Sequence, residues 1–446
     1  MMFKIYGKHR VFLLLVLAAH LLFLGWQVVN GNLYLVDSEE YIAEAENILS
    51  TGTFYCGELD EPVRYDDFTK RPPVYPLFLS FVFGIGGNAW LVIILQNLLS
   101  LFNFILLIEI GTFIGLQEKH FRWMIPLILL YPAQFIYANM VMSEILFQTF
   151  LLGMTLAAMK GISAKSWRWI GIYTLLLIAG AMTKPVLYLF IIPHSVVIAA
   201  LIVRWRSPMG VWHLVIPFLI WGAYMKANER QTGYFHFSSI QNLSLLQYTT
   251  YNLLIHTYGP DSALVLADGI LYRSLDQPSY AEGQKLLVKE CSDVIRAHKL
   301  QFVKFHIKGM INLFMDPGRF DLYSFTGIDS QHNSPGFLSA FSEGGYRGIG
   351  LYLQKQPLLI VLLLVLVALA NAVKLAGLIY FAFCRRVSVE NRVIIIGLVL
   401  YIAGLTGSSG ASRFAVPVFP LLLLMIPCFI IALVSLRSAS NKKKVY

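Results

Sequence analysis

The sequence predicts an all-α polytopic membrane protein with about ten transmembrane helices. Of its 446 residues, 57% are hydrophobic and only 13% are charged, whereas a soluble domain carries about 25% charged residues. Apolar segments of roughly 20 residues, the length that crosses a bilayer, recur along the chain. Many of the basic residues behind the net charge of +10 lie in short patches beside these segments. Basic patches of this kind orient a membrane protein, so we do not expect a nucleic-acid partner.

The expected spans determine the topology. A basic flank at Lys4, Lys8 and Arg10 precedes the first span, and Lys442, Lys443 and Lys444 follow the last. Both termini are therefore expected in the cytoplasm of a cell bounded by a bacterial inner or plasma membrane. The expected spans are approximately 11–29, 89–115, 122–138, 141–160, 167–183, 185–204, 211–227, 357–383, 393–410 and 414–436.

Two longer segments are expected outside the membrane, and they divide the chain into three parts. Residues 1–227 form an N-terminal membrane catalytic module whose first outer loop is 30–88, residues 228–356 form a small extracytoplasmic subdomain, and residues 357–446 hold the C-terminal transmembrane helices. In the first outer loop, apolar residues at helical spacing predict a surface-lying helix that ends at Gly52. The apolar stretch 74–83 is too short to cross a bilayer and is expected to be re-entrant or surface-lying.

Asp37 is the leading candidate for chemistry. It follows the first span at the outer surface. A carboxylate here can act as a general base that takes the proton from an acceptor hydroxyl or amine. The alternative is a helix cap, because Glu40 lies three residues later, as in a capping box.

Lys70 and Arg71 are the candidates for binding a phosphate. They stand directly before Pro72 and Pro73, which stiffen the backbone. Fixed cations stabilise the negative charge that grows on a departing phosphate, and arginine can bind phosphate with two parallel hydrogen bonds. The alternative is nonspecific binding of lipid headgroups.

The short outer hairpins also carry ionisable residues. Glu144 starts the fourth expected span, Lys184 lies between the fifth and sixth, and Arg413 between the last two. A carboxylate at membrane depth is a functional candidate, although Ser143-Glu144 could simply cap a helix. Lys184 and Arg413 could be snorkelling anchors or ligands of an anionic headgroup.

Other features are less specific. The carboxylates Asp37, Glu39 and Glu144 could gather a divalent cation, but they do not establish a metal site, and no other cofactor is expected. Cys56 and Cys291 fall in outer segments where a disulfide is possible. The turn that begins at Asp316, together with Asp321, is interpreted as an ordinary loop, with contact to the acceptor as the alternative.

These motifs, taken in order, resemble the GT-C superfamily of integral-membrane glycosyltransferases. The similarity is to the branch with protein O-mannosyltransferases and the lipid A aminoarabinose transferase. One departure is Ser38, where many relatives have Glu, so a second acid would have to be Glu39 or Glu40, or be absent. The matching residues are Asp37 with Tyr41 and Ala45, Lys70-Arg71-Pro72-Pro73 with Tyr75 and Pro76, Ser143-Glu144, Lys184-Pro185, and Arg413 with Pro417.

The resemblance implies an inverting transfer of a sugar from a polyprenyl-phosphate donor on the extracytoplasmic face, with Asp37 as general base. Glu144 is expected to be catalytic as well, and Lys70, Arg71, Lys184 and Arg413 are expected to bind the donor phosphate. The acceptor could be a lipid, a glycan or a protein, and membrane lipids are further partners. The alternatives are a secondary transporter or lipid-linked glycan flippase, which would place ionisable residues near the bilayer midplane, or a noncatalytic scaffold.

Overall fold

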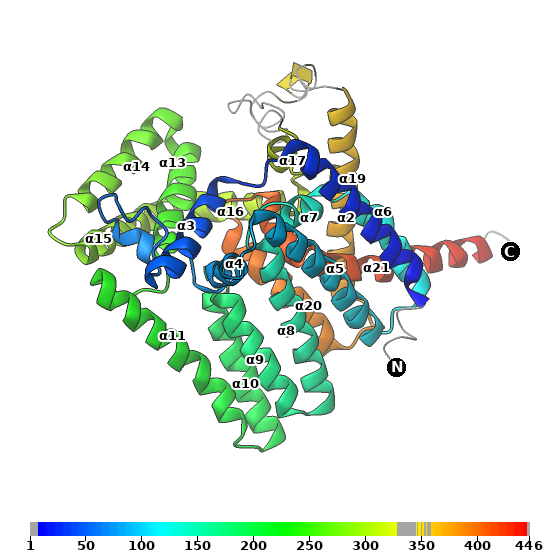
Figure 1. The fold of residues 1–446 in the computed structure, drawn as a ribbon. Helices are drawn as coiled ribbons and strands as arrows, with labels where there is room; N and C mark the ends of the chain where they lie inside the picture. Colours follow the sequence, from blue (N-terminus) through cyan, green and yellow to red (C-terminus); the bar gives the residue numbers. More distant parts are fainter. Residues whose placement is uncertain are drawn as a thin grey trace.

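The computed structural model describes residues 8–327 and 358–443, with residues 345, 347, 348, 350, 351 and 354 between them. Lys4 and Lys444 of the basic termini lie outside the described residues. All regular structure in the described part is helical (Figure 1). Seven helical segments are long and apolar enough to cross a membrane. They are α2 (Arg10–Asn30), α5 (Ala89–Phe113), α8 (Glu144–Ala164), η2 with α10 (Pro185–Trp205), most of α19 (Leu358–Ala382), α20 (Val389–Thr406), and η4 (Ser412–Val418) with the first part of α21 (Phe419–Lys443).

Three expected spans differ from this set. The segment 122–138 is not one helix: α6 (Glu118–Leu129) ends before Tyr131, and α7 (Pro132–Ala138) begins at a proline, which disfavours a helical residue before it. Helix α9 (Trp167–Ala181) is apolar but has only 15 residues. Helix α11 (Gly210–Thr232) has 23 residues but carries charged residues in its second half. The structure therefore confirms an all-helical integral membrane protein, with seven clear candidate spans in its described part.

The first outer loop folds into two short helices joined by a turn. Helix α3 (Val36–Thr51) ends where Gly52 adopts φ +73°, as the sequence predicts. A short helical turn, η1 (Tyr65–Phe68), precedes α4 (Val74–Gly84), which has only 11 residues. The two helices pack together, and the Ser80 hydroxyl donates to the carbonyl of Ala45 at 3.1 Å. This packing holds the first turn of α3 near the start of α4.

The second outer segment has two parts. Helices α13, α14 and α15 stand to one side of the molecule, beyond α3 (Figure 1), around a small core that includes Leu246, Ile270 and Leu287. Helices α16 and α17 instead pack against the membrane helices. The helices of this segment are α12 (Ile240–Ser244), η3 (Leu245–Thr250), α13 (Tyr251–Tyr258), α14 (Pro260–Leu275), α15 (Tyr280–Ala297), α16 (Lys299–Met315) and α17 (Arg319–Thr326).

The cysteines are all free. Cys56 and Cys291 are both buried thiols, so the disulfide considered from the sequence is not formed. Burial raises the pKa of both thiols, which keeps them protonated and unreactive at neutral pH. Cys291 acts as a small apolar side chain in the core that also contains Leu287.

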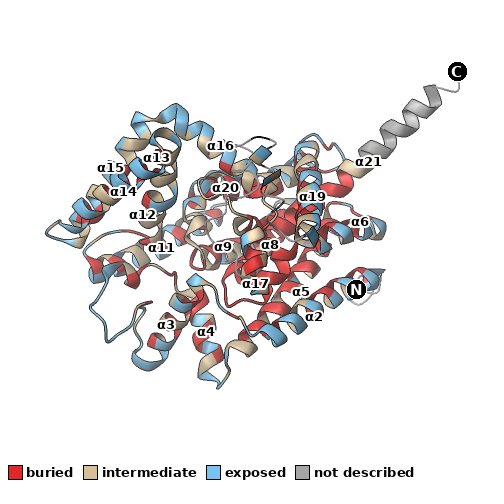
Figure 2. Ribbon diagram, turned by 90° about the horizontal axis from the view of Figure 1, so that it is seen from above, coloured by how far each residue is buried: buried red, intermediate tan, exposed pale blue. Residues whose placement is uncertain are grey.

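The buried core is concentrated around α5, α7, α8 and the start of α21, whereas the outer helices α13 to α15 are largely exposed (Figure 2). The segment from Pro132 to Gln148 is buried without interruption. It includes the turn between α7 and α8, which is irregular backbone packed inside protein. The beginning of α8 is therefore held on all sides by the core.

Candidate functional site

Seven ionisable side chains from five separate parts of the chain form one continuous series of ion pairs, which we call the charged cluster. It joins the loop between α2 and α5 to the starts of α8, η2 and η4. It contains four cations and three carboxylates and so carries one net positive charge. Its members are Asp37 and Glu40 of α3, Lys70 and Arg71 before α4, Glu144 at the start of α8, Lys184 before η2, and Arg413 of η4.

One half of the charged cluster lies within the first outer loop. Glu40 accepts from Lys70 Nζ at 2.5 Å through Oε1 and from Arg71 Nε at 2.6 Å through Oε2. Arg71 Nη2 donates to Asp37 Oδ1 at 2.8 Å. Glu40, only a secondary candidate from the sequence, therefore positions both cations of the Lys-Arg-Pro-Pro element.

The other half is built by the short hairpins. Arg413 Nη2 lies 2.5 Å from Asp37 Oδ2, and Arg413 Nε donates to Glu144 Oε1. Lys184 Nζ donates to the same oxygen of Glu144 at 2.7 Å. Arg413 is thus the residue that joins the two halves.

Access differs within the charged cluster. The side chain of Glu144 is fully buried, whereas those of Asp37, Glu40 and Arg413 are 22%, 25% and 24% exposed. Glu144 Oε2 is buried without a hydrogen-bond partner among the described residues. A ligand would therefore approach from the side of Asp37 and Glu40.

The arginines control the ionisation of Asp37. Burial alone would raise its pKa, but the facing guanidinium groups of Arg413 and Arg71 hold that pKa well below its usual range. Burial of Arg71 opposes its charge, yet Tyr41, Asp37 and Glu40 raise its pKa above the usual value. Asp37 is therefore a carboxylate, and Arg71 a cation, throughout the neutral pH range.

Helix capping does not account for the two carboxylates. Helix α3 begins at Val36, and Ser38 rather than Asp37 serves its start, since Ser38 Oγ accepts from the backbone N–H of Leu35 at 2.8 Å. At α8, the Ser143 hydroxyl makes no cap and instead bonds to Tyr41 Oη at 2.9 Å. The capping alternative for Asp37 is wrong.

The tyrosines named from the sequence lie beneath the charged cluster. The Arg71 guanidinium stands 4.9 Å from the ring centroid of Tyr41, whose ring packs edge-on against Tyr75. Tyr75 Oη donates to Gln96 Oε1 at 2.6 Å. Both tyrosines are buried. Tyr41 contacts the Arg71 guanidinium and Tyr75 packs against Tyr41, whereas Glu39 is exposed to solvent.

Amide side chains that sequence reasoning did not single out hold the turn before Glu144. This turn has irregular backbone whose carbonyl groups need donors inside the membrane. Buried amides on α2 and α5 supply them, and only their place within apolar runs distinguishes them in the sequence. The pairs are Asn97 Nδ2 to Ala138 at 3.1 Å, Gln27 Nε2 to Asn139 at 3.0 Å and Gln96 Nε2 to Met140 at 2.6 Å.

The turn at Asp316 and Asp321 is more than the ordinary loop that the sequence predicts. Both carboxylates hydrogen-bond to Ser412, the neighbour of Arg413. The segment therefore reaches the charged cluster from the second outer loop.

The three carboxylates considered for a divalent cation do not form a metal site. The guanidinium of Arg413 lies between Asp37 and Glu144, and Glu39 points away to solvent. Within the described residues, no group of three or more His, Cys, Asp or Glu side chains is placed to hold a metal ion.

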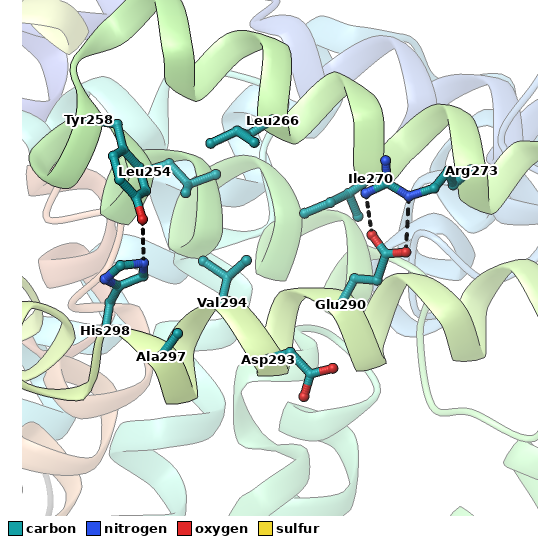
Figure 3. A pocket seen from close by; sticks show the side chains of 10 residues that line it. All are labelled: Leu254, Tyr258, Leu266, Ile270, Arg273, Glu290, Asp293, Val294, Ala297 and His298. Carbon is teal, nitrogen blue, oxygen red and sulfur yellow. Dashed lines mark hydrogen bonds and ion pairs between the residues drawn. The ribbon is translucent and has the colours of Figure 1, made fainter.

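A separate hollow of about 390 Å³ lies between α13, α14 and α15 (Figure 3). Its aliphatic lining includes Leu266 of α14 and Val294 of α15, and Tyr258 Oη bonds to His298 Nε2 at 3.0 Å at one end. At the other end, Arg273 pairs with both oxygens of Glu290, at 3.0 and 2.6 Å. The hollow contains no member of the charged cluster, where the ionisable groups suited to chemistry gather.

The chain is similar in fold to two solved structures of one protein. No family model and no curated protein match the chain. The chain is similar to the structure of ArnT from Cupriavidus metallidurans bound to undecaprenyl phosphate, with 13% identity and a TM-score of 0.40, over 95% of this chain and 78% of that chain. It is also similar to the apo state of ArnT from the same organism, with 14% identity and a TM-score of 0.36, over 90% and 77% of the two chains.

Proposed function

We propose that this protein is an integral-membrane glycosyltransferase that moves a sugar, with inversion, from a polyprenyl-phosphate donor to an acceptor on the extracytoplasmic face. The observation that carries the proposal is the charged cluster itself. It presents a partly exposed, ionised Asp37 between two arginines at the outer ends of membrane helices. A base and phosphate-binding cations are the two components that such a transfer requires.

The net charge of the cluster suits the donor. A sugar linked to a lipid through a phosphodiester carries one negative charge, which matches the single net positive charge of the cluster. Lys70, Arg71 and Arg413 are partly accessible or lie beside accessible groups. When the sugar leaves, the phosphate gains further negative charge, and cations that are already in place stabilise it.

The proposed transfer is a single displacement at the anomeric carbon. The acceptor oxygen or nitrogen attacks the anomeric carbon of the sugar and loses its proton to Asp37. The bond between that carbon and the phosphate oxygen breaks, and its electron pair leaves with the polyprenyl phosphate. Attack from the face opposite the phosphate inverts the anomeric centre.

Asp37 must exchange a partner to act as base. In the described structure both of its oxygens bind arginine, which lowers its basicity. We infer that the donor phosphate takes over hydrogen bonds from Arg71 or Arg413 and so frees one carboxylate oxygen. Coupling of this kind would make Asp37 competent only when the donor is bound.

We assign Glu144 a positioning role rather than the catalytic role expected from the sequence. It is fully buried and its Oε1 is shared by Lys184 and Arg413. A buried carboxylate of this kind holds two cations at the depth where the phosphate would lie.

The test uses the purified protein in lipid nanodiscs, with labelled polyprenyl-phosphate sugars as donors and cell-envelope lipids, glycans and proteins as acceptors. Mass spectrometry of glycans in cells with and without the gene identifies which donor and acceptor to use. We expect Asp37→Asn to reduce kcat by about 10²- to 10⁴-fold, the usual contribution of a positioned base. Donor binding should be retained, because Arg71 and Arg413 remain.

The matched control is Glu46→Gln, since Glu46 is an exposed acid on the same helix and lies outside the charged cluster. It should leave kcat unchanged. A fully active Asp37→Asn protein would contradict the base assignment. Unchanged glycans and donors in cells without the gene would favour transport or scaffolding instead.

A further inference from the structure

Ser412, the residue before Arg413, is held by three residues from two parts of the chain. Its backbone N–H donates to Asp316 Oδ2 at 2.8 Å, and its hydroxyl donates to Asp321 Oδ2 at 2.7 Å. Its carbonyl oxygen accepts from Tyr131 Oη at 3.3 Å. Every polar group of this buried serine is therefore occupied, which leaves the backbone at the start of η4 little freedom.

Asp321 is itself fixed from two sides. It is 4% exposed, and its second oxygen accepts from Tyr137 Oη of α7 at 2.7 Å. The turn that brings it there passes through Gly318 at φ +73°, a conformation that favours glycine. A Cβ at Gly318 would also lie 3.3 Å from Ser412 Oγ. The second outer loop is thus built to place this carboxylate against the last hairpin.

The same loop is anchored close to the hairpin by α16. A Cβ at Gly309 would lie 1.7 Å from the carbonyl oxygen of Gly407, so the two backbones approach as only glycine allows. His306 Nε2 lies 2.6 Å from the carbonyl oxygen of Gly404. The loop and the hairpin therefore behave as one packed unit.

We propose that Asp321 is a positioning residue that fixes Ser412 so that Arg413 reaches Asp37 and Glu144 together. This inference rests on the proposed function, because it assigns Arg413 to the donor phosphate. Without Asp321, the Ser412 hydroxyl and Tyr137 lose their shared acceptor. Only the backbone contacts of Ser412 with Asp316 and Tyr131 then remain, so the residue next to Arg413 is held less firmly. The second outer loop then controls the site without touching the reacting atoms.

The carboxylate of Asp321 would also give the site a pH dependence. Burial raises the pKa of Asp321 to about 6, although hydrogen bonds from Tyr137 and Ser412 favour the charged form. The charged groups facing it are Asp316, which favours the neutral form, and Arg413, which favours the ionised form. Below about pH 6 the carboxyl carries a proton and can no longer accept both hydrogen bonds, so positioning should weaken as the pH falls.

The loss of activity near pH 6, which we call the acid limb, can be assigned to Asp321. Asp37 does not titrate in this range, because its pKa lies well below its usual range. Wild-type kcat/KM for the donor should therefore fall as the pH drops through about 6. In Asp321→Asn, the amide oxygen accepts one hydrogen bond and its N–H donates the other. This variant should lose about 2- to 10-fold in kcat/KM at pH 8 and should lack the limb near pH 6.

Asp321→Ala removes both hydrogen bonds and should lose about 10- to 100-fold in kcat/KM for the donor, with the acceptor KM unchanged. Asp293→Asn is the matched control, since Asp293 is an exposed aspartate on α15 whose one ion-pair partner among the described residues is Arg296. It should keep the wild-type rate and the wild-type limb. An Asp321→Asn protein with the wild-type limb would overturn the proposal.

A readout that needs no activity separates this proposal from the proposed function. Hydrogen exchange of the backbone amides in Ser412–Val418, corrected for the intrinsic effect of pH, should be faster in Asp321→Ala than in wild type at pH 8. Unchanged exchange would overturn the positioning role. If wild type transfers no sugar from any donor but this exchange difference is present, the proposed function fails and the positioning of the hairpin stands.

Discussion

Two polar regions meet at η4, and they use different chemistry. The charged cluster is open to ligand on one side, through Asp37 and Glu40. The second region, which we call the amide network, is buried and contains no Asp, Glu, Lys or Arg. It consists of His20 of α2, Ser100 and Asn103 of α5, Gln134 of α7 and Gln148 of α8.

The amide network is internally paired. Gln134 and Gln148 exchange two hydrogen bonds, at 2.9 and 2.8 Å, and Gln134 also donates to Ser100 Oγ at 2.9 Å. Gln148 Nε2 reaches the carbonyl oxygen of Val416 at 2.6 Å. Since Gln134 and Gln148 both donate and accept, the network pairs the backbone carbonyl of Val416 without burying a charge.

The comparison shows where each kind of polar group is stable in this fold. The charged side chains are paired with one another, including the fully buried Glu144, because an unpaired ion in an apolar interior costs several kcal/mol. Neutral amides serve where irregular backbone must be paired inside the membrane. Helix η4 joins the two regions, since Arg413 belongs to the charged cluster and Val416 accepts from the amide network.

The largest expected effect on stability comes from removing the buried carboxylate of the charged cluster. Glu144→Ala leaves Arg413 without one partner and Lys184 without its carboxylate, both at low exposure. The free energy of unfolding in mixed micelles should fall by about 3–5 kcal/mol.

Glu144→Gln keeps the shape and one acceptor, and it should cost clearly less than Glu144→Ala. Glu144→Gln also serves as the folding control for substitutions at this position. If Glu144→Ala were as stable as wild type, Lys184 and Arg413 would have to be hydrated without their carboxylate partner. The proposed difference between the charged cluster and the amide network would then be wrong.

The charged cluster was more accessible to sequence reasoning than the amide network. Lys184 and Arg413 stand out as single cations between apolar runs, and the shortness of their hairpins predicts that both lie at a membrane surface. The pairing of Arg413 with both Asp37 and Glu144 could not be predicted, because it depends on how three distant segments pack. Gln134 and Gln148 occur at ordinary helix positions, so only the fold reveals that they bond to each other.

The break at Tyr131 was also missed. The apolar composition of 122–138 is that of a continuous span, and Pro132 is compatible with either a kink or a helix start. The observed restart of the helix at Pro132 depends on partners far away in the chain, such as the carbonyl of Ser412, which accepts from Tyr131 Oη.

A smaller effect is expected from the amide network. Gln148→Leu leaves the carbonyl of Val416 and the amides of Asn103 and Gln134 without this partner. The free energy of unfolding should fall by about 1–3 kcal/mol, and a single hydrogen bond inside a membrane protein is worth about 0.6 kcal/mol on average.

The double variant Gln134→Leu with Gln148→Leu sharpens this test, since it removes both members of the exchanged pair. It should cost less than the sum of the two single variants, because neither amide is left facing an apolar side chain. A loss for Gln148→Leu as large as that for Glu144→Ala would mean that neutral and charged groups are equally critical at η4.

The smallest effect is expected outside both regions, at the hollow between α13, α14 and α15. Arg273 and Glu290 form an exposed pair there, with side chains 58% and 23% exposed, and such pairs are screened by solvent and contribute little. Arg273→Gln and Glu290→Gln should therefore leave kcat and both KM values unchanged in the transfer assay. A rise in the KM of the acceptor alone would instead place acceptor binding in this hollow. The molecule would then have a third polar region, whose charges bind the acceptor rather than the donor.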